Sequence, residues 1–178
     1  MARVLVCYAT SEGQTATIAE RIGDVLATDG HDTDLVHAKH PPSGLDPGEY
    51  DGVVVGASIH MGSHQTAIDQ FVRDHRTTLN RCPSAFFSVS LTAAHPDPAD
   101  REPVREILED FLEETGWDPD TTLLVGGALK YSEYGLLKRF LMRRVVGKEG
   151  GDTDTSRDYE YTDWEEVEAF AHDFATLL

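Results

Sequence analysis

The chain contains little cysteine and no long apolar run. Its 178 residues include two cysteines, Cys7 and Cys82, and these lack CxxC spacing. Neither a disulfide framework nor a zinc site is therefore indicated. No stretch approaches the ~18 apolar residues of a membrane-spanning helix, and no signal peptide precedes the first predicted strand. We expect a cytoplasmic protein without a bound metal.

Positive charge is also scarce. The chain has 32 acidic residues against 15 lysines and arginines, which gives a formal net charge of −17. Such a charge repels the phosphate backbone of nucleic acids and argues against general nucleic-acid binding. The composition is typical of proteins from a salt-rich cytosol, where screening reduces self-repulsion. This hypothesis predicts a melting temperature that rises in molar salt, whereas equal stability in dilute buffer would contradict it.

Apolar runs alternate with helical patterns along the chain. The runs typical of strands lie at about 3–8, 33–37, 51–58, 85–90 and 121–126. Helical stripes of apolar residues lie between them, and Thr162-Asp-Trp-Glu165 has the pattern of a capping box that opens a last helix. Strands that alternate with helices predict βαβ units and a doubly wound parallel sheet. We expect an α/β fold in one domain, 1–178.

A polar loop, Thr10-Ser-Glu-Gly-Gln-Thr15, lies between the first strand and the first helix. A helix N-terminus offers free backbone N–H groups and a partial positive charge, which favour an anion. Hydroxyl groups add donors, and Gly13 allows the backbone to approach a ligand closely. The loop has neither a Walker A nor a G-x-G-x-x-G pattern, so a monophosphate suits it best. An ordinary turn with a hydroxyl cap is the alternative, and the carboxylate of Glu12 argues mildly for it.

Two further loops follow the third and fourth strands, at 58–62 and 91–95. In open α/β sheets, ligands bind at the carboxyl ends of strands where the strand order switches, and all three loops leave such ends. His60, His64 and His95 lie in or beside these loops. Because no carboxylate or thiol stands at ligand spacing from them, we expect no metal site. His60 and His95 are candidates for proton transfer.

A long segment, residues 127–161, separates the fifth strand from the last helix. Its window 130–148 carries six basic residues and one acidic residue, so the window is +5 and the rest of the chain −22. Apolar residues in the window share one half of a helix. A basic, apolar helix is typical of contact with a membrane surface or a partner. The alternative is a packed helix whose arginines pair with the acidic body.

The T-x-x-G-x-T pattern after the first strand resembles the FMN phosphate loop of the flavodoxins. This resemblance implies a five-stranded parallel sheet of order 2-1-3-4-5, with FMN held by the first loop and its flavin ring between the other two. The residues concerned are Thr10, Ser11, Glu12, Gly13, Gln14, Thr15, Ser58, Ile59, His60, Met61, Gly62, Leu91, Thr92, Ala93, Ala94 and His95. The usual stacking aromatic of flavodoxins is not evident in either later loop. An open flavin face suits a large flat substrate.

Longer stretches resemble the flavodoxin-like, quinone-dependent protoporphyrinogen oxidases of bacteria. They include Val54-Val-Gly-Ala-Ser-Ile59, Gly127-Ala-Leu-Lys-Tyr131, Gly150-Gly-Asp-Thr-Asp-Thr155 and Tyr161-Thr-Asp-Trp164. The long basic insertion after the fifth strand is the distinguishing feature of that family. The resemblance implies an FMN-dependent oxidoreductase that passes electrons from protoporphyrinogen IX to a respiratory quinone.

The same resemblance implies attachment to the inner face of the cell membrane. The residues expected to contact the membrane or the substrate are Lys138, Arg139, Arg143 and Arg144. A flavodoxin-type electron carrier or an FMN-dependent quinone reductase would use the same cofactor site. A partner-binding module without FMN is a third alternative, and self-association is left open.

Overall fold

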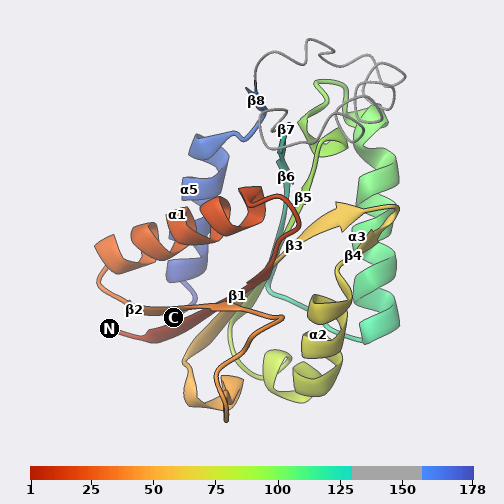
Figure 1. Cartoon of the computed structure of the whole chain (residues 1–178). Coiled ribbons are helices and arrows are strands. Elements are labelled where there is room, and N and C mark those ends of the chain that lie inside the picture. The colour runs from red at the N-terminus through yellow and green to blue at the C-terminus, as the bar shows by residue number, and fades with distance from the viewer. Residues whose placement is uncertain (130–157) are drawn as a thin grey trace.

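The computed structural model describes residues 1–129 and 158–178, and its centre is a parallel sheet (Figure 1). The parallel strands are β1 (Arg3–Ala9), β2 (Asp32–His37), β3 (Gly52–His60), β5 (Ser84–Ser90) and β6 (Thr121–Gly126). They are hydrogen-bonded in the order β2-β1-β3-β5-β6. This order confirms the predicted 2-1-3-4-5, because β5 and β6 are the fourth and fifth parallel strands.

Helices cover both faces of the sheet (Figure 1). The helices α1 (Gln14–Thr28) and α5 (Trp164–Ala175) pack against one face, and α2 (Thr66–Leu79) and α3 (Glu102–Thr115) against the other. Short 3-10 helices lie in the connections, η1 (Pro47–Glu49), η2 (Thr92–Ala94) and η3 (Pro98–Arg101). The result is the three-layer α/β architecture that the alternation of strands and helices predicts.

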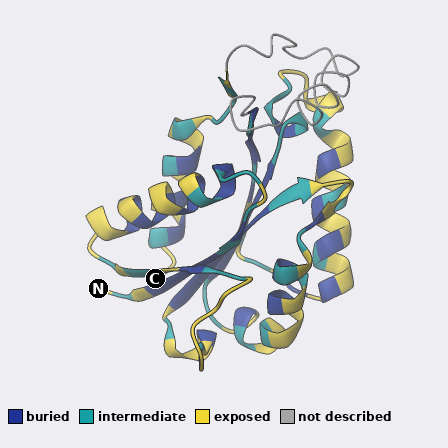
Figure 2. Ribbon diagram, viewed as in Figure 1, coloured by how far each residue is buried: buried dark blue, intermediate teal, exposed yellow. Residues whose placement is uncertain are grey.

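The central strands are buried on both sides, as Figure 2 shows. Successive side chains of β1 point to opposite faces, so Val4 and Val6 join the core under α1 and α5. Leu5 and Cys7 join the core under α2 and α3, and all four side chains are fully buried. Because helices cover both faces of the sheet, side chains on both sides of β1 must be apolar. The strand therefore appears in the sequence as a continuous apolar run rather than as an alternation of apolar and polar residues.

The third parallel strand is longer than the sequence predicts. It continues to His60 and returns as the antiparallel strand β4 (Ser63–His64), with Ile59 opposite His64. Met61 and Gly62 form the two-residue turn, with φ angles of 52° and 82°. Positive φ at both positions is characteristic of a type I′ hairpin turn. Ile59 and His60, expected in a loop beyond the strand, thus belong to it.

The last helix begins one residue later than its predicted capping box. Asp163 is the N-cap, and its carboxylate accepts a hydrogen bond from the backbone N–H of Glu166 at 3.1 Å. The hydroxyl of Thr162 instead donates to the carbonyl oxygen of Gly126 at 2.8 Å. The predicted box was wrong in register because Thr162 serves a tertiary contact that the local pattern does not reveal.

Two short antiparallel strands, β7 (Ala128–Leu129) and β8 (Tyr159–Glu160), form a small sheet that we call the stem. Leu129 is buried there and packs with Leu91, Tyr159 and Tyr161. The stem brackets residues 130–157, so Lys138, Arg139, Arg143 and Arg144 lie outside the described residues. Within the two described ranges, no helix is both long and apolar enough to cross a membrane.

Candidate cofactor site

The phosphate loop, residues 10–15, leaves the carboxyl end of β1 and turns into α1. The hydroxyl of Thr10 accepts a hydrogen bond from the backbone N–H of Gly13 at 2.8 Å. Gly13 occupies the N-cap position with a φ of 91°, in the left-handed region that glycine adopts without strain. The helix α1 therefore begins directly beyond the carboxyl end of β1, and the first N–H groups of a helix have no hydrogen-bond partner within it.

The N-terminus of α1 differs from those of the other described helices. Like α2 and α3 it has no side-chain cap, but unlike them it has no carboxylate in its first turn. The first turns of α2, α3 and α5 each contain at least one carboxylate. Acidic residues stabilise a helix N-terminus through the helix dipole, so their omission at α1 leaves the positive end for an external anion. A phosphate group fits this arrangement.

Gln14 was expected to hold the phosphate, but its side chain reaches toward the stem. Its Nε2 donates to Glu160 Oε1 at 3.0 Å and to Thr162 Oγ1 at 2.9 Å. Gln14 and Thr15 are both nearly buried, with exposed fractions of 8% and 1%. The backbone N–H of Gln14 therefore stays a candidate for phosphate binding, whereas its amide nitrogen fastens α1 to β8.

Adjacency of β1, β3 and β5 brings the three predicted loops to one edge of the sheet. In the strand register, Ala9 pairs with Ala57 and Ser58 pairs with Val89. Thr10, Ser58 and Ser90 therefore follow one another across the carboxyl ends of neighbouring strands. This is the topological position at which α/β sheets bind ligands.

The second predicted group, residues 58–62, lies on the β3–β4 hairpin. Ser58 and Ile59 are half-buried at the end of β3, and His60 is exposed. Met61 at the turn has an exposed fraction of 94%, with its left-handed φ noted above. The hairpin thus presents a polar strand end and an apolar tip at the edge of the site.

The third group, residues 91–95, follows β5 and contains η2. The backbone N–H of Ala93 donates to the hydroxyl of Ser90 at 3.0 Å, which fixes the start of the turn. His95 ends it, with Nδ1 3.0 Å from a carboxylate oxygen of Asp100. Leu91, Thr92 and Ala94 are half-buried, and Ala93 is buried. The Ala93–Ser90 hydrogen bond and the His95–Asp100 contact thus hold the backbone of residues 91–95 in place. A fixed backbone of this kind is suited to line one side of a flat ring.

A residue that the sequence pattern does not reveal joins the phosphate loop to residues 58–62. Gln65 precedes α2, and its Oε1 accepts a hydrogen bond from the backbone N–H of Ser58 at 2.9 Å. Its Nε2 donates to the hydroxyl of Ser58 and lies 3.4 Å from that of Ser11. Nothing in the sequence distinguishes this glutamine from the exposed Gln70, because both contacts depend on how the strands are placed.

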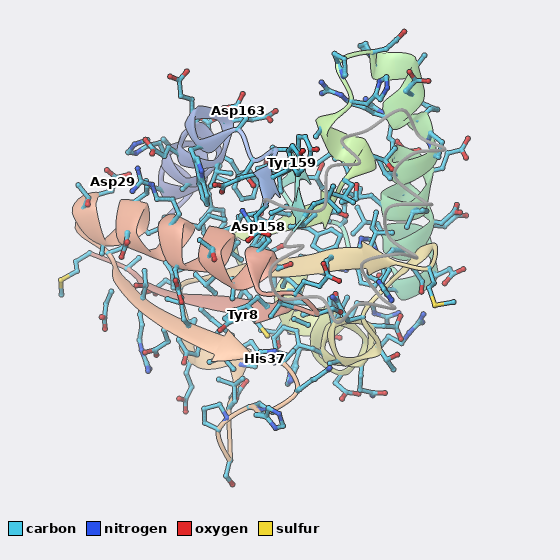
Figure 3. All side chains as sticks on the ribbon, turned by 45° about the horizontal axis from the view of Figure 1, so that its top comes forward. Tyr8, Asp29, His37, Asp158, Tyr159 and Asp163 are labelled. Atoms are coloured by element: carbon cyan, nitrogen blue, oxygen red, sulfur yellow. The ribbon has the colours of Figure 1, made fainter. Side chains whose placement is uncertain are left out.

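A group of aromatic and imidazole rings lies at the ends of β1 and β2, beside the phosphate loop. Tyr8 and His37 are partners in the register of the two strands, and their ring centroids are 5.3 Å apart (Figure 3). The ring of His40 lies 5.9 Å from that of His37. Burial, followed by the charges of His40 and Lys39, lowers the pKa of His37.

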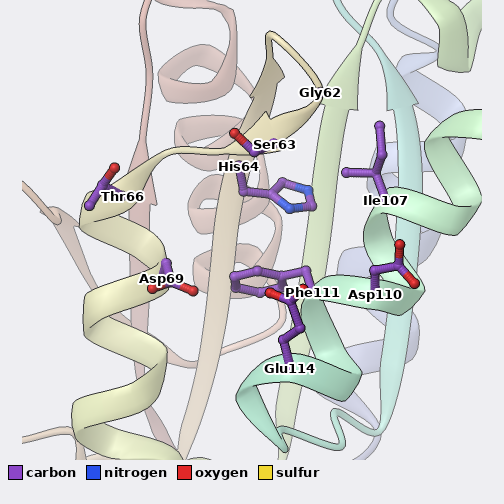
Figure 4. A pocket seen from close by; sticks show the side chains of 9 residues that line it. All are labelled: Gly62, Ser63, His64, Thr66, Asp69, Ile107, Asp110, Phe111 and Glu114. Carbon is purple, nitrogen blue, oxygen red and sulfur yellow. The ribbon is translucent and has the colours of Figure 1, made fainter.

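A cleft of about 290 Å³ lies between α2, α3 and the β3–β4 hairpin (Figure 4). Of the predicted cofactor residues only Gly62 lines it. His64 forms part of its wall and packs edge-on against Phe86 and Phe111, with centroid distances of 5.2 and 4.8 Å. His64 Nε2 is 2.8 Å from the hydroxyl of the buried Ser88. The cleft is therefore separate from the phosphate loop and from residues 91–95.

Acidification is expected to destabilise the fold through His64. Burial lowers the pKa of this imidazole from 6.5 to about 4. Between these values the unfolded chain binds a proton that the folded chain excludes, so stability falls as pH decreases from 6.5 toward 4. At pH 5 the loss is about 2 kcal/mol relative to pH 7.5. Urea unfolding of the wild type and of His64→Gln at both pH values measures it.

The control for this effect is His60→Gln, which removes an exposed histidine at the end of β3. We expect His64→Gln to reduce the difference in unfolding free energy between the two pH values by about 2 kcal/mol, and His60→Gln to leave it unchanged. An equal pH dependence in the wild type and His64→Gln would show that the buried imidazole does not control acid stability.

A flavodoxin-domain family model matches residues 5–156 of the chain. Protoporphyrinogen IX dehydrogenase (quinone) of Escherichia coli strain K12 is 37% identical over 177 residues, which cover 98% of this chain and 96% of that protein. The chain belongs to the protoporphyrinogen IX dehydrogenase (quinone) family. The Leishmania major protein of the same name is 35% identical over 98% of this chain and 75% of its own length. The match to family members thus includes the stem and both ends of the insertion.

Solved structures confirm the fold of this family member. Flavodoxin 1 of Bacillus cereus superposes with a TM-score of 0.60 at 18% identity, covering 99% of both chains. Flavodoxin 2 of the same organism gives a TM-score of 0.58 at 22% identity, covering 99% of this chain and all of the other. At these identities the likeness shows the flavodoxin fold, in agreement with the strand order.

Proposed function

We propose that the chain is an FMN-dependent oxidoreductase that transfers electrons from protoporphyrinogen IX to a quinone. The main support is the 37% identity, over 98% of the chain, to a protein named for that activity. The second support is local, since an uncapped helix N-terminus without a first-turn carboxylate lies beside two further strand ends. Bound FMN would supply a two-electron carrier between the substrate and the quinone.

Different residues of the chain would bind the phosphate and the flavin ring of the cofactor. The backbone N–H groups at the start of α1 and the hydroxyls of Thr10 and Ser11 would bind the phosphate, where the helix dipole favours a negative charge. Residues 58–62 and 91–95 would lie on the two sides of the flavin ring. Glu12, which is half-buried in the same loop, stays in the predicted set.

The substrate would reach the flavin at the open edge of the site. Neither flanking group carries a Trp, Tyr or Phe to stack on the ring, so one face is left for a flat molecule. Met61 at the hairpin tip would add apolar contact area, because its side chain is almost fully exposed. His60 and His95 remain the candidates for proton transfer, since both lie within the two flanking groups.

The proposal is tested first by titrating the apoprotein with FMN. Binding should quench the flavin fluorescence and shift its absorption bands, and the complex should be reduced by protoporphyrinogen IX under anaerobic conditions. A chain that binds FMN without being reduced by the porphyrinogen would be a carrier or a quinone reductase. A chain that binds no flavin would contradict the proposal as a whole.

Membrane docking is a separate part of the proposal, supported by the basic composition of residues 130–148. The double variant Arg143→Glu/Arg144→Glu reverses two of the positive charges and should weaken sedimentation with anionic vesicles at least tenfold, since each basic residue near such a surface contributes about 1 kcal/mol. Vesicles of zwitterionic lipid are the control, and binding there should change little. Unaltered binding to anionic vesicles would rule out this docking role.

A further inference from the structure

The side chain of Gln65 lies between the end of β3 and the loop after β1. Although it occupies the N-cap position of α2, it makes no capping hydrogen bond to that helix. Its amide is used in the other direction, with Oε1 on the Ser58 N–H and Nε2 on the Ser58 hydroxyl. The same Nε2 lies 3.4 Å from the hydroxyl of Ser11. One amide therefore links the phosphate loop to the end of β3, two segments that are far apart in the sequence.

The two ends of this link belong to different parts of the candidate cofactor site. Ser11 is an exposed residue of the phosphate loop, and Ser58 is half-buried where β3 leaves the sheet. The contact to Ser58 is the firm one, because it uses both polar atoms of the amide. The hydrogen bonds to Ser58 therefore hold the amide of Gln65 in place, and its remaining N–H faces Ser11 in the phosphate loop.

We propose that Gln65 is a positioning residue that sets the spacing between the phosphate subsite and the flavin-ring subsite. This inference rests on the proposed binding of FMN. A ligand with two binding groups gains most when both subsites are held at its own spacing, because the second group then binds within an existing complex. A ligand that carries only one of the groups gains nothing from that spacing.

The test compares FMN with riboflavin, which has the same ring system and lacks the phosphate. We expect Gln65→Met, which keeps the length of the side chain, to raise the Kd for FMN about tenfold, the effect of losing ordinary hydrogen bonds. The Kd for riboflavin should change by less than about twofold. Fluorescence titration of the full chain measures both ligands.

The matched control is Gln70→Met on the same helix. Gln70 is exposed and donates to Asp74 at 2.8 Å, so the substitution has the same chemistry away from the loops. It should leave both dissociation constants unchanged. Thermal unfolding of each variant establishes that the fold is retained before binding is compared.

A second variant, Ser11→Ala, removes the acceptor at the phosphate loop and leaves the Gln65–Ser58 contacts in place. It should also weaken FMN and spare riboflavin. The double variant with Gln65→Met should lose less affinity for FMN than the two single losses added together, because the contact that the two residues share is lost only once. Additive losses, or equal losses for the two ligands, would overturn the inference. Failure of the wild type to bind FMN would instead overturn the proposed function.

Discussion

Ser11→Asp is expected to weaken FMN binding about a hundredfold. The substitution places a carboxylate in an exposed loop position beside the uncapped N-terminus of α1. There the new charge would neutralise the positive end of the helix dipole and repel the phosphate, and at short range such a like-charge contact costs about 3 kcal/mol. Titration with FMN in dilute buffer measures the effect, which should decrease as salt screens the charges.

The control for this charge effect is Ser43→Asp, which adds the same charge to an exposed serine in the connection between β2 and β3. It should change the Kd for FMN less than about twofold if only local repulsion matters. Riboflavin binding by Ser11→Asp should also be close to wild type, because that ligand has no phosphate. Equal weakening by the two serine variants would mean that net charge, rather than the phosphate loop, governs binding.

Gly56→Ala is expected to lower the free energy of unfolding by about 3 kcal/mol and the melting temperature by roughly 9 °C. Gly56 lies in β3 in register with Phe87 of β5, whose ring covers it. A Cβ at this position would lie 1.9 Å from Phe87 Cζ, far inside contact distance. Since Phe87 is fully buried, its ring cannot move aside without disturbing the core.

The clash itself is tested by a second substitution. Phe87→Leu shortens the side chain, so Gly56→Ala/Phe87→Leu should be more stable than Gly56→Ala, although Phe87→Leu alone should destabilise the wild type. Urea unfolding of the four proteins gives the coupling energy between the two positions. Additive effects would show that the loss at Gly56 comes from something other than its contact with Phe87.

Much of the fold could be predicted because it depends on local pattern. The strand at 121–126 agrees to the residue, since threonine and valine favour strands and a segment of six residues is short for a helix. The strand order and the position of the three loops follow from topology, which the resemblance supplied. The phosphate loop, residues 10–15, was recognisable because the residues that shape it, Gly13 and the hydroxyl residues around it, are close together in the sequence.

The parts that could not be predicted depend on contacts between distant elements. The β3–β4 turn has methionine where the common hairpin sequences have asparagine or aspartate, so the signal for a type I′ turn was absent. Gln14 turns its amide to Glu160, which lies 146 positions away in the sequence. Gln65 bridges two loops only because β1 and β3 are neighbours. Side-chain amides of this kind have no spacing rule by which a sequence could reveal them.

The central claim is tested most directly by an anaerobic assay with the FMN-loaded protein, protoporphyrinogen IX and a quinone. The proposed function predicts that porphyrin fluorescence appears at a rate that depends on protein, FMN and quinone together, with one quinone reduced for every two electrons removed. Formation of porphyrin at the uncatalysed rate, by a protein that binds FMN and passes electrons from another donor to the quinone, would contradict it.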